Sequence, residues 1–117
     1  MTLRTTKEPG VDIKARHEAY GRYFEVEVKG EPGKAAKSKA SGREVRFIGA
    51  LGQILTRIKP DRQYRYGIAF PDTYRDLVVR RIDPALMKVL RLSFFFVNDK
   101  GRVEHLDWRG LRETKVA

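Results

Sequence analysis

The chain has 117 residues, no cysteine, and 25 Lys or Arg against 15 Asp or Glu, which gives a formal net charge of +10. Its length suits a single domain, and the lack of cysteine excludes disulfides and thiolate chemistry. No apolar run reaches the ~20 residues of a membrane span, and the N-terminus lacks the apolar core of a signal peptide. We therefore expect a cytoplasmic protein with no membrane partner.

The excess of positive charge favours an anionic partner. Duplex DNA carries about one negative charge per 1.7 Å of its axis, so a few Lys and Arg contacts give salt-sensitive affinity. RNA-binding and ribosome-associated proteins carry the same balance of charge. Composition therefore indicates a nucleic-acid partner but does not distinguish DNA from RNA.

Two alternating segments, residues 11–16 and 24–29, predict a β-hairpin of half-buried strands. Residues 1–10 are expected to be a flexible lead-in, because Pro9-Gly10 breaks any helix before the first strand. Only some registers keep one face of the hairpin apolar. In these registers Val11, Ile13 and Ala15 face Val28, Val26 and Phe24.

The simplest of these registers also pairs charged residues on the other face. It sets Asp12 opposite Glu27 and Lys14 opposite Glu25, with Lys29 two residues beyond Glu27. Adjacent carboxylates repel each other unless a cation lies between them, and Mg²⁺ uses carboxylate, phosphate and water oxygens. The pattern thus predicts a metal site. The alternative is a solvated face on which the charges pair as Lys14–Glu25 and Glu27–Lys29.

Asp12, followed on the neighbouring strand by Glu27-Val28-Lys29, resembles the metal site of the PD-(D/E)xK nuclease superfamily, which has the restriction-endonuclease-like fold. Two further motifs follow these residues, Gly52-Gln53 and Ala69-Phe70-Pro71. With them, residues 11–108 look like the small stand-alone branch related to the fdxN-element excision-controlling factors. Two departures accompany this resemblance. Arg57 stands where the family usually has Tyr four residues after the Gln, and only ten residues precede Val11, where the fold normally has a helix.

The resemblance implies an α/β fold, with a central mixed sheet flanked by helices and the N-terminal core helix missing. It also implies that Asp12, Glu27 and the Val28 carbonyl bind Mg²⁺, for which Mn²⁺ can substitute. Lys29 would position the attacking water, and Gln53 would orient the site.

The loop over residues 30–43 is basic, apart from Glu31, and is expected to be mobile and to lie along a phosphate backbone. A solubilising loop with no contact role is the alternative. The following helix carries further cations on a polar face beside Gly49 and Gln53. The predicted nucleic-acid contacts are Lys34, Lys37, Lys39, Arg43, Arg46 and Arg57.

The rest of the chain predicts further helices and strands. A capping box at Ser41–Glu44 starts a helix that ends near Lys59, before Pro60. Its buried stripe is expected to contain Phe47, Leu51, Ile54 and Ile58, joined by Ile48 and Leu55. After it we expect a strand over 65–70, a helix over 73–81 capped by Asp72, a helix over 84–90 started by Asp83-Pro84, a hairpin over 92–108 and a fraying tail over 109–117.

These observations predict one domain, an Mg²⁺-dependent endonuclease-like protein that hydrolyses DNA phosphodiesters. Little chain remains for reading bases, so cutting would be directed by DNA structure or by a protein partner, and a homodimer would place two sites on two strands. A catalytically silent DNA-binding or recombination accessory factor on the same fold is the first alternative. An RNA-binding or ribosome-associated protein is the second.

Overall fold

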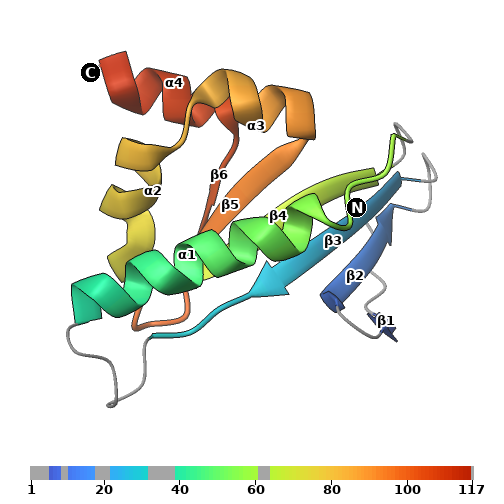
Figure 1. Ribbon diagram of the computed structural model, residues 1–117, viewed down its shortest axis with the longest axis horizontal. Coiled ribbons are helices and arrows are strands. Elements are labelled where there is room, and N and C mark those ends of the chain that lie inside the picture. Colours follow the sequence, from blue (N-terminus) through green and yellow to red (C-terminus); the bar gives the residue numbers. More distant parts are fainter. Residues whose placement is uncertain (1–5, 9–10, 18–21, 32–38, 61–63, 117) are drawn as a thin grey trace.

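The computed structural model describes residues 6–8, 11–17, 22–31, 39–60 and 64–116 (Figure 1). These residues form an α/β fold around a six-stranded mixed sheet with the strand order β1-β2-β3-β4-β5-β6. The elements are β1 Thr6–Glu8, β2 Val11–His17, β3 Arg22–Val28, α1 Lys39–Leu55, β4 Tyr64–Pro71, the 3₁₀ turn η1 Asp72–Tyr74, α2 Arg75–Arg81, α3 Pro84–Leu90, β5 Leu92–Val97, β6 Val103–Leu106 and α4 Trp108–Val116. The predicted α/β class, with a central mixed sheet flanked by helices, is confirmed.

The strand pairing of the predicted hairpin is also confirmed. β2 and β3 are antiparallel, and Ile13 pairs with Val26 and Lys14 with Glu25. Asp12 and Glu27 are the next residues beyond the Ile13–Val26 pair on the two strands. β3, β4 and β5 run parallel to one another, and β6 returns antiparallel to β5.

The hydrophobic core lies on one face of the sheet. Strands β4 and β5 bury alternate residues there, and all four α-helices add side chains to the same cluster. α1 crosses the sheet over β3 and β4 (Figure 1). The core includes Tyr66, Ile68 and Phe70 of β4, Leu92, Phe94 and Phe96 of β5, and Phe47, Ile54, Val78, Met87 and Leu111 of the helices. β3, β4 and β5 are parallel and neighbour one another in chain order. The two connections between them have the same handedness, so both lie on the same face of the sheet.

Burial of β3 is the reverse of what its alternation suggests. Glu25 and Glu27 are each 4% exposed, whereas Val28 is 45% exposed. The two glutamates are in register with Tyr66 and Ile68, so they lie on the face that α1 covers. A solvated face for these carboxylates is therefore wrong. Handedness of the β3–α1–β4 crossover, rather than the hydrophobicity of β3, decides which face is covered.

The opposite face of the sheet carries no helix among the described residues, and two aromatic rings pack together on it. Phe24 packs edge to face against Phe95, with ring centroids 5.7 Å apart. Both rings lie over Gly67, where a Cβ would be 2.8 Å from an atom of each. The glycine therefore admits two aromatic rings at the centre of this face.

Helix α1 differs from its prediction at both ends. It begins at Lys39, so Ser41 lies inside it and the expected capping box does not start it. It ends at Leu55 because Thr56 and Arg57 form a tight turn, in which the Thr56 hydroxyl donates to the Gln53 carbonyl (2.8 Å) and the Arg57 N–H to the Ile54 carbonyl (2.9 Å). Arg57 thus follows the helix.

The buried stripe of α1 is narrower than predicted. Phe47 and Ile54 are buried as expected, but Ile48 and Leu55 are 51% and 53% exposed. Ala50, fully buried between Phe47 and Ile54, lets the helix approach the sheet closely.

Later elements mostly follow their predictions. β4, β5 and α3 are found, and the Asp83 carboxylate caps α3 by accepting from the Ala85 N–H (2.8 Å). Asp72 does not cap a helix: it opens η1, and α2 starts only at Arg75 with no side-chain cap.

Three predicted irregular segments contain regular structure. Thr6–Glu8 of the expected lead-in forms β1, and residues 39–43 of the expected loop belong to α1. Lys34 and Lys37 lie outside the described residues. The expectation that residues 109–117 fray is wrong, because α4 extends to Val116 and buries Leu111 completely.

We expect Leu111→Ala to lower the free energy of unfolding by about 2–5 kcal/mol, since it leaves a cavity in the core. Val116→Ala, on the same helix but 81% exposed, should change it by less than about 0.5 kcal/mol. Urea denaturation of both variants checks this. Equal, small effects would show that α4 does not contribute to the core.

Candidate functional site

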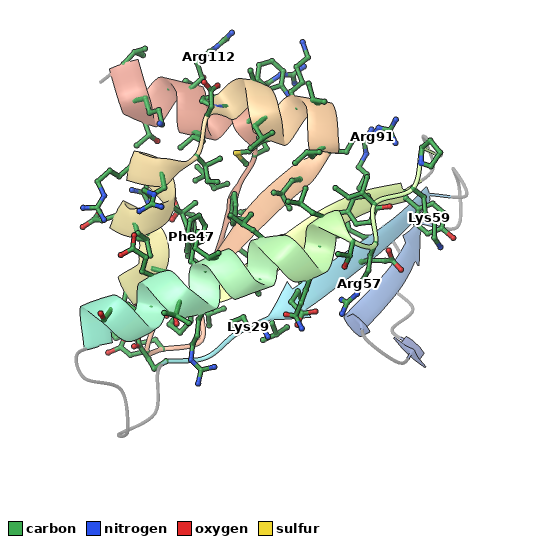
Figure 2. The ribbon with its side chains drawn as sticks, viewed as in Figure 1. Lys29, Phe47, Arg57, Lys59, Arg91 and Arg112 are labelled. Atoms are coloured by element: carbon green, nitrogen blue, oxygen red, sulfur yellow. The ribbon has the colours of Figure 1, made fainter. Side chains whose placement is uncertain are left out.

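A polar cluster lies at the margin of the core, between β3 and the C-terminal end of α1. Glu27 is its centre, because this buried carboxylate contacts a cation at each oxygen. Lys29 Nζ is 3.3 Å from Glu27 Oε1, and Arg57 Nη1 donates to Oε2 at 2.9 Å. The Glu27 side chain is only 5% exposed, whereas those of Lys29 and Arg57 are 24% and 23% exposed. Figure 2 shows Lys29 and Arg57 on the same side of α1.

The segment after β3 is fixed in place by contacts with β4 and η1. The Lys29 N–H donates to the Ala69 carbonyl (2.9 Å), and the Tyr74 hydroxyl donates to the Gly30 carbonyl (2.8 Å). The Tyr74 ring stacks on Phe70 at 4.5 Å. The backbone that carries Lys29 is therefore held by hydrogen bonds to β4 and η1.

Arg57 is held by a different tyrosine. The Tyr66 hydroxyl accepts from the Lys59 N–H (2.7 Å) and donates to the Arg57 carbonyl (3.4 Å). These bonds fix the turn that follows α1. Sequence reasoning placed Arg57 among the nucleic-acid contacts, but its guanidinium is committed to Glu27.

Two buried oxygens of this region have no hydrogen-bond partner among the residues that the structure describes, Glu25 Oε2 and Gln53 Oε1. Gln53 lies in the last turn of α1, and Arg57 lies in the tight turn that follows it. Buried acceptors are almost always satisfied by a donor or a cation. Oxygen ligands of this kind fit a hard divalent cation such as Mg²⁺.

The metal-ligand set is only partly inside the described residues. No group of three His, Cys, Asp or Glu side chains suited to a metal occurs among them. Asp12 is placed by its backbone in β2, next to Glu27 in the register, and its side chain lies outside what is described. The Val28 side chain points to the opposite face of the sheet, and its carbonyl is the group that the resemblance assigns to the metal.

The predicted nucleic-acid contacts are spread more widely. Arg43 Nε lies 3.1 Å from Glu31 Oε2, and Arg46 is exposed on α1. Lys39 opens α1. Glu31 also accepts from the Thr73 hydroxyl, so this acid links the end of β3 to η1. Sequence reasoning did not single out Glu25, whose Oε2 has no partner among the described residues, although the alternation of β3 placed it on the face of Glu27.

Comparison with known proteins shows similarity of fold. An XisH family protein from Nostoc punctiforme superimposes with a TM-score of 0.52 and 18% identity, over 89% of this chain and 83% of its own. An fdxN element excision controlling factor protein from Anabaena variabilis gives 0.53 and 19%, over 90% and 83%. No family model matches the sequence, and no curated protein does. None of the described helices is both long and apolar enough to cross a membrane.

We expect Arg57→Met to destabilise the protein by about 2 kcal/mol, because it leaves a buried carboxylate oxygen of Glu27 without a partner. Arg43→Met is the matched control. It breaks a more exposed pair with Glu31, and should cost less than about 1 kcal/mol. Chemical denaturation of both variants measures the difference. If the two costs were equal, the burial of Glu27 would not impose the penalty described here.

Stability should also fall at high pH. Burial raises the pKa of the Tyr66 phenol and of the Tyr74 phenol above the ordinary value of 10.0. The unfolded chain therefore releases these protons first, so the free energy of unfolding decreases as the pH rises above about 10 and is unaffected by them below it. Tyr66→Phe/Tyr74→Phe should flatten this decrease in denaturation curves taken from about pH 9 to 11. An unchanged slope would contradict it.

Proposed function

We propose that this protein is an Mg²⁺-dependent endonuclease-like protein that hydrolyses DNA phosphodiesters. The observation that carries the proposal is the buried Glu27, which pairs with Lys29 directly after β3, on the face of the sheet that α1 covers. Buried oxygens of Glu25 and Gln53 that have no hydrogen-bond partner among the described residues support the presence of a cation in this region.

The residues would divide the work as follows. Asp12, Glu27 and the Val28 carbonyl would hold the metal. A bound Mg²⁺ would polarise a phosphate oxygen and lower the pKa of a water molecule. The Lys29 ammonium, which lies 3.3 Å from Glu27 Oε1, would orient that water and stabilise the charge that develops on the phosphate. Gln53 would orient the site through its amide.

DNA is the proposed substrate because of the net charge of +10 and the fold. Two proteins of similar fold carry names that refer to XisH and to control of excision of an fdxN element, which supports a role in DNA rearrangement. We further propose that the protein acts in the cytoplasm, that it pairs as a homodimer, and that DNA structure or a protein partner directs the cutting.

A catalytically silent accessory factor for DNA recombination is the second candidate, and one contact favours it. Both oxygens of Glu27 already contact a cation, and one of these cations is Arg57. A metal ion would have to displace or rearrange the Arg57 contact. If it does not, the cluster is a structural ion pair and the fold serves only to bind DNA.

Cleavage assays separate these candidates. We expect wild-type protein with Mg²⁺ or Mn²⁺ to cut at least one of supercoiled, linear, flapped or branched DNA, and EDTA to stop the reaction. Asp12→Asn and Glu27→Gln should each lower the rate by a hundredfold or more, roughly the loss expected for groups that stabilise transition-state charge. Gel analysis of the products provides the measurement.

Asp76→Asn is the control, because Asp76 is an exposed carboxylate of α2. It should leave cutting unchanged. Binding of every DNA without cutting under any metal would reject the nuclease and support the accessory factor. Tight RNA binding that neither Mg²⁺ nor Asp12→Asn alters would support an RNA-binding protein instead.

A further inference from the structure

A second site lies at the other end of the parallel strands. A hollow of about 580 Å³ opens at the amino ends of β4 and β5, beside α3 and the start of α4. Its lining contains four cationic residues, Arg65, Lys88, Arg91 and Arg109. Asp107 is the one carboxylate that lines it among the described residues, and its Oδ1 already accepts from the Gly110 N–H (2.8 Å). The hollow is therefore strongly basic.

Three cations surround the Trp108 ring, and two of them, Lys88 and Arg109, line the hollow. Lys88 Nζ lies 4.8 Å from the centroid of the ring, and the guanidinium carbons of Arg109 and Arg112 lie 5.1 and 5.4 Å from it. Within the part of the chain that the structure describes, none of these three forms an ion pair with a carboxylate. Cation–π contacts orient the three charges but do not neutralise them. An anion would relieve their mutual repulsion.

The hollow at the carboxyl ends of the strands has the opposite character. It measures about 520 Å³, and its lining includes Glu31, Asp72 and Asp99, with Lys29 as its one cation among the described residues. Before any metal binds, this hollow attracts a phosphate less strongly than the basic hollow at the amino end does. The two ends of the sheet thus differ in charge.

Flat surfaces accompany the cations in the basic hollow. Phe24, His105 and Trp108 also line it, and His105 stacks on Phe95 at 4.7 Å. A volume of this size suits a small ligand. Aromatic rings and guanidinium planes bind unpaired bases by stacking, while neighbouring cations bind the phosphate. Bases inside a duplex are not available for such stacking.

We propose that this basic hollow binds a nucleotide of single-stranded DNA. The site is separate from Glu27 and Lys29, and it needs no metal. Only the choice of DNA rests on the proposed function. Single-stranded DNA seated here would be held at the amino ends of β4 and β5, away from the carboxylates at the opposite edge.

Trp108 makes the test direct, because it is the only tryptophan of the chain and its fluorescence reports on the hollow. Oligothymidylate added in EDTA should change this fluorescence saturably. Lys88→Glu/Arg109→Glu should weaken binding about tenfold or more. It should also reduce the slope of log affinity against log salt by about 1.4, since each contact to a single strand contributes ~0.7.

The control, Arg80→Glu/Arg102→Glu, makes the same change in net charge at exposed residues of α2 and of the β5–β6 turn. It should retain most of the affinity, and circular dichroism checks that both proteins fold. If the first variant does not fold, Lys88→Gln/Arg109→Gln replaces it and should weaken binding in the same direction.

Several results would overturn the proposal: no change in Trp108 fluorescence, equal losses in the two charge-reversal variants, tighter binding of duplex, or equal affinity for free thymidine monophosphate. Asp12→Asn should leave the fluorescence titration unchanged. Failure of the nuclease assay would therefore not contradict the proposed nucleotide site. Loss of the fluorescence response would not contradict the nuclease proposal.

Discussion

The constraint on which the structure depends is the burial of Glu27. Burying a carboxylate costs less free energy when its oxygens have partners, and for Glu27 these partners are Lys29 and Arg57. This requirement fixes the turn after α1, which Tyr66 holds from β4, and the backbone after β3, which Tyr74 holds from η1. The same contacts that permit the burial also determine the geometry of the candidate site.

A one-sided sheet explains why a polar cluster can lie so close to the core. The helices cover the face formed by Tyr66, Ile68, Phe94 and their neighbours, and β3 lies beside it, with glutamates in place of apolar residues. On the face that the helices cover, the side chains of β4 and β5 are therefore mainly aromatic and aliphatic, whereas those of β3 are carboxylates. The other face keeps Phe24 and Phe95 packed over Gly67.

Charge is distributed along the strands as well as across the sheet. Carboxylates line the hollow at the carboxyl ends, and Lys and Arg residues line the hollow at the amino ends. A polyanion in this field would be oriented before it made any specific contact. The net charge of +10 attracts a polyanion to the protein, and the cations around Trp108 attract it to the amino ends of the strands.

The sequence by itself determined what depends on near neighbours: the alternation of β2 and β3, their register, the start of α3 at Asp83-Pro84 and the β5–β6 hairpin. Each follows from local parity, a cap or a turn. Tertiary structure alone decided which face of β3 is buried, where α1 ends and that α4 packs through Leu111. The first depends on the handedness of a crossover, the second on a hydroxyl of Tyr66 from another strand, and the third on a core built by distant segments. Alternation places Glu25, Glu27 and Lys29 on one face, but only the position of α1 brings Arg57 to Glu27.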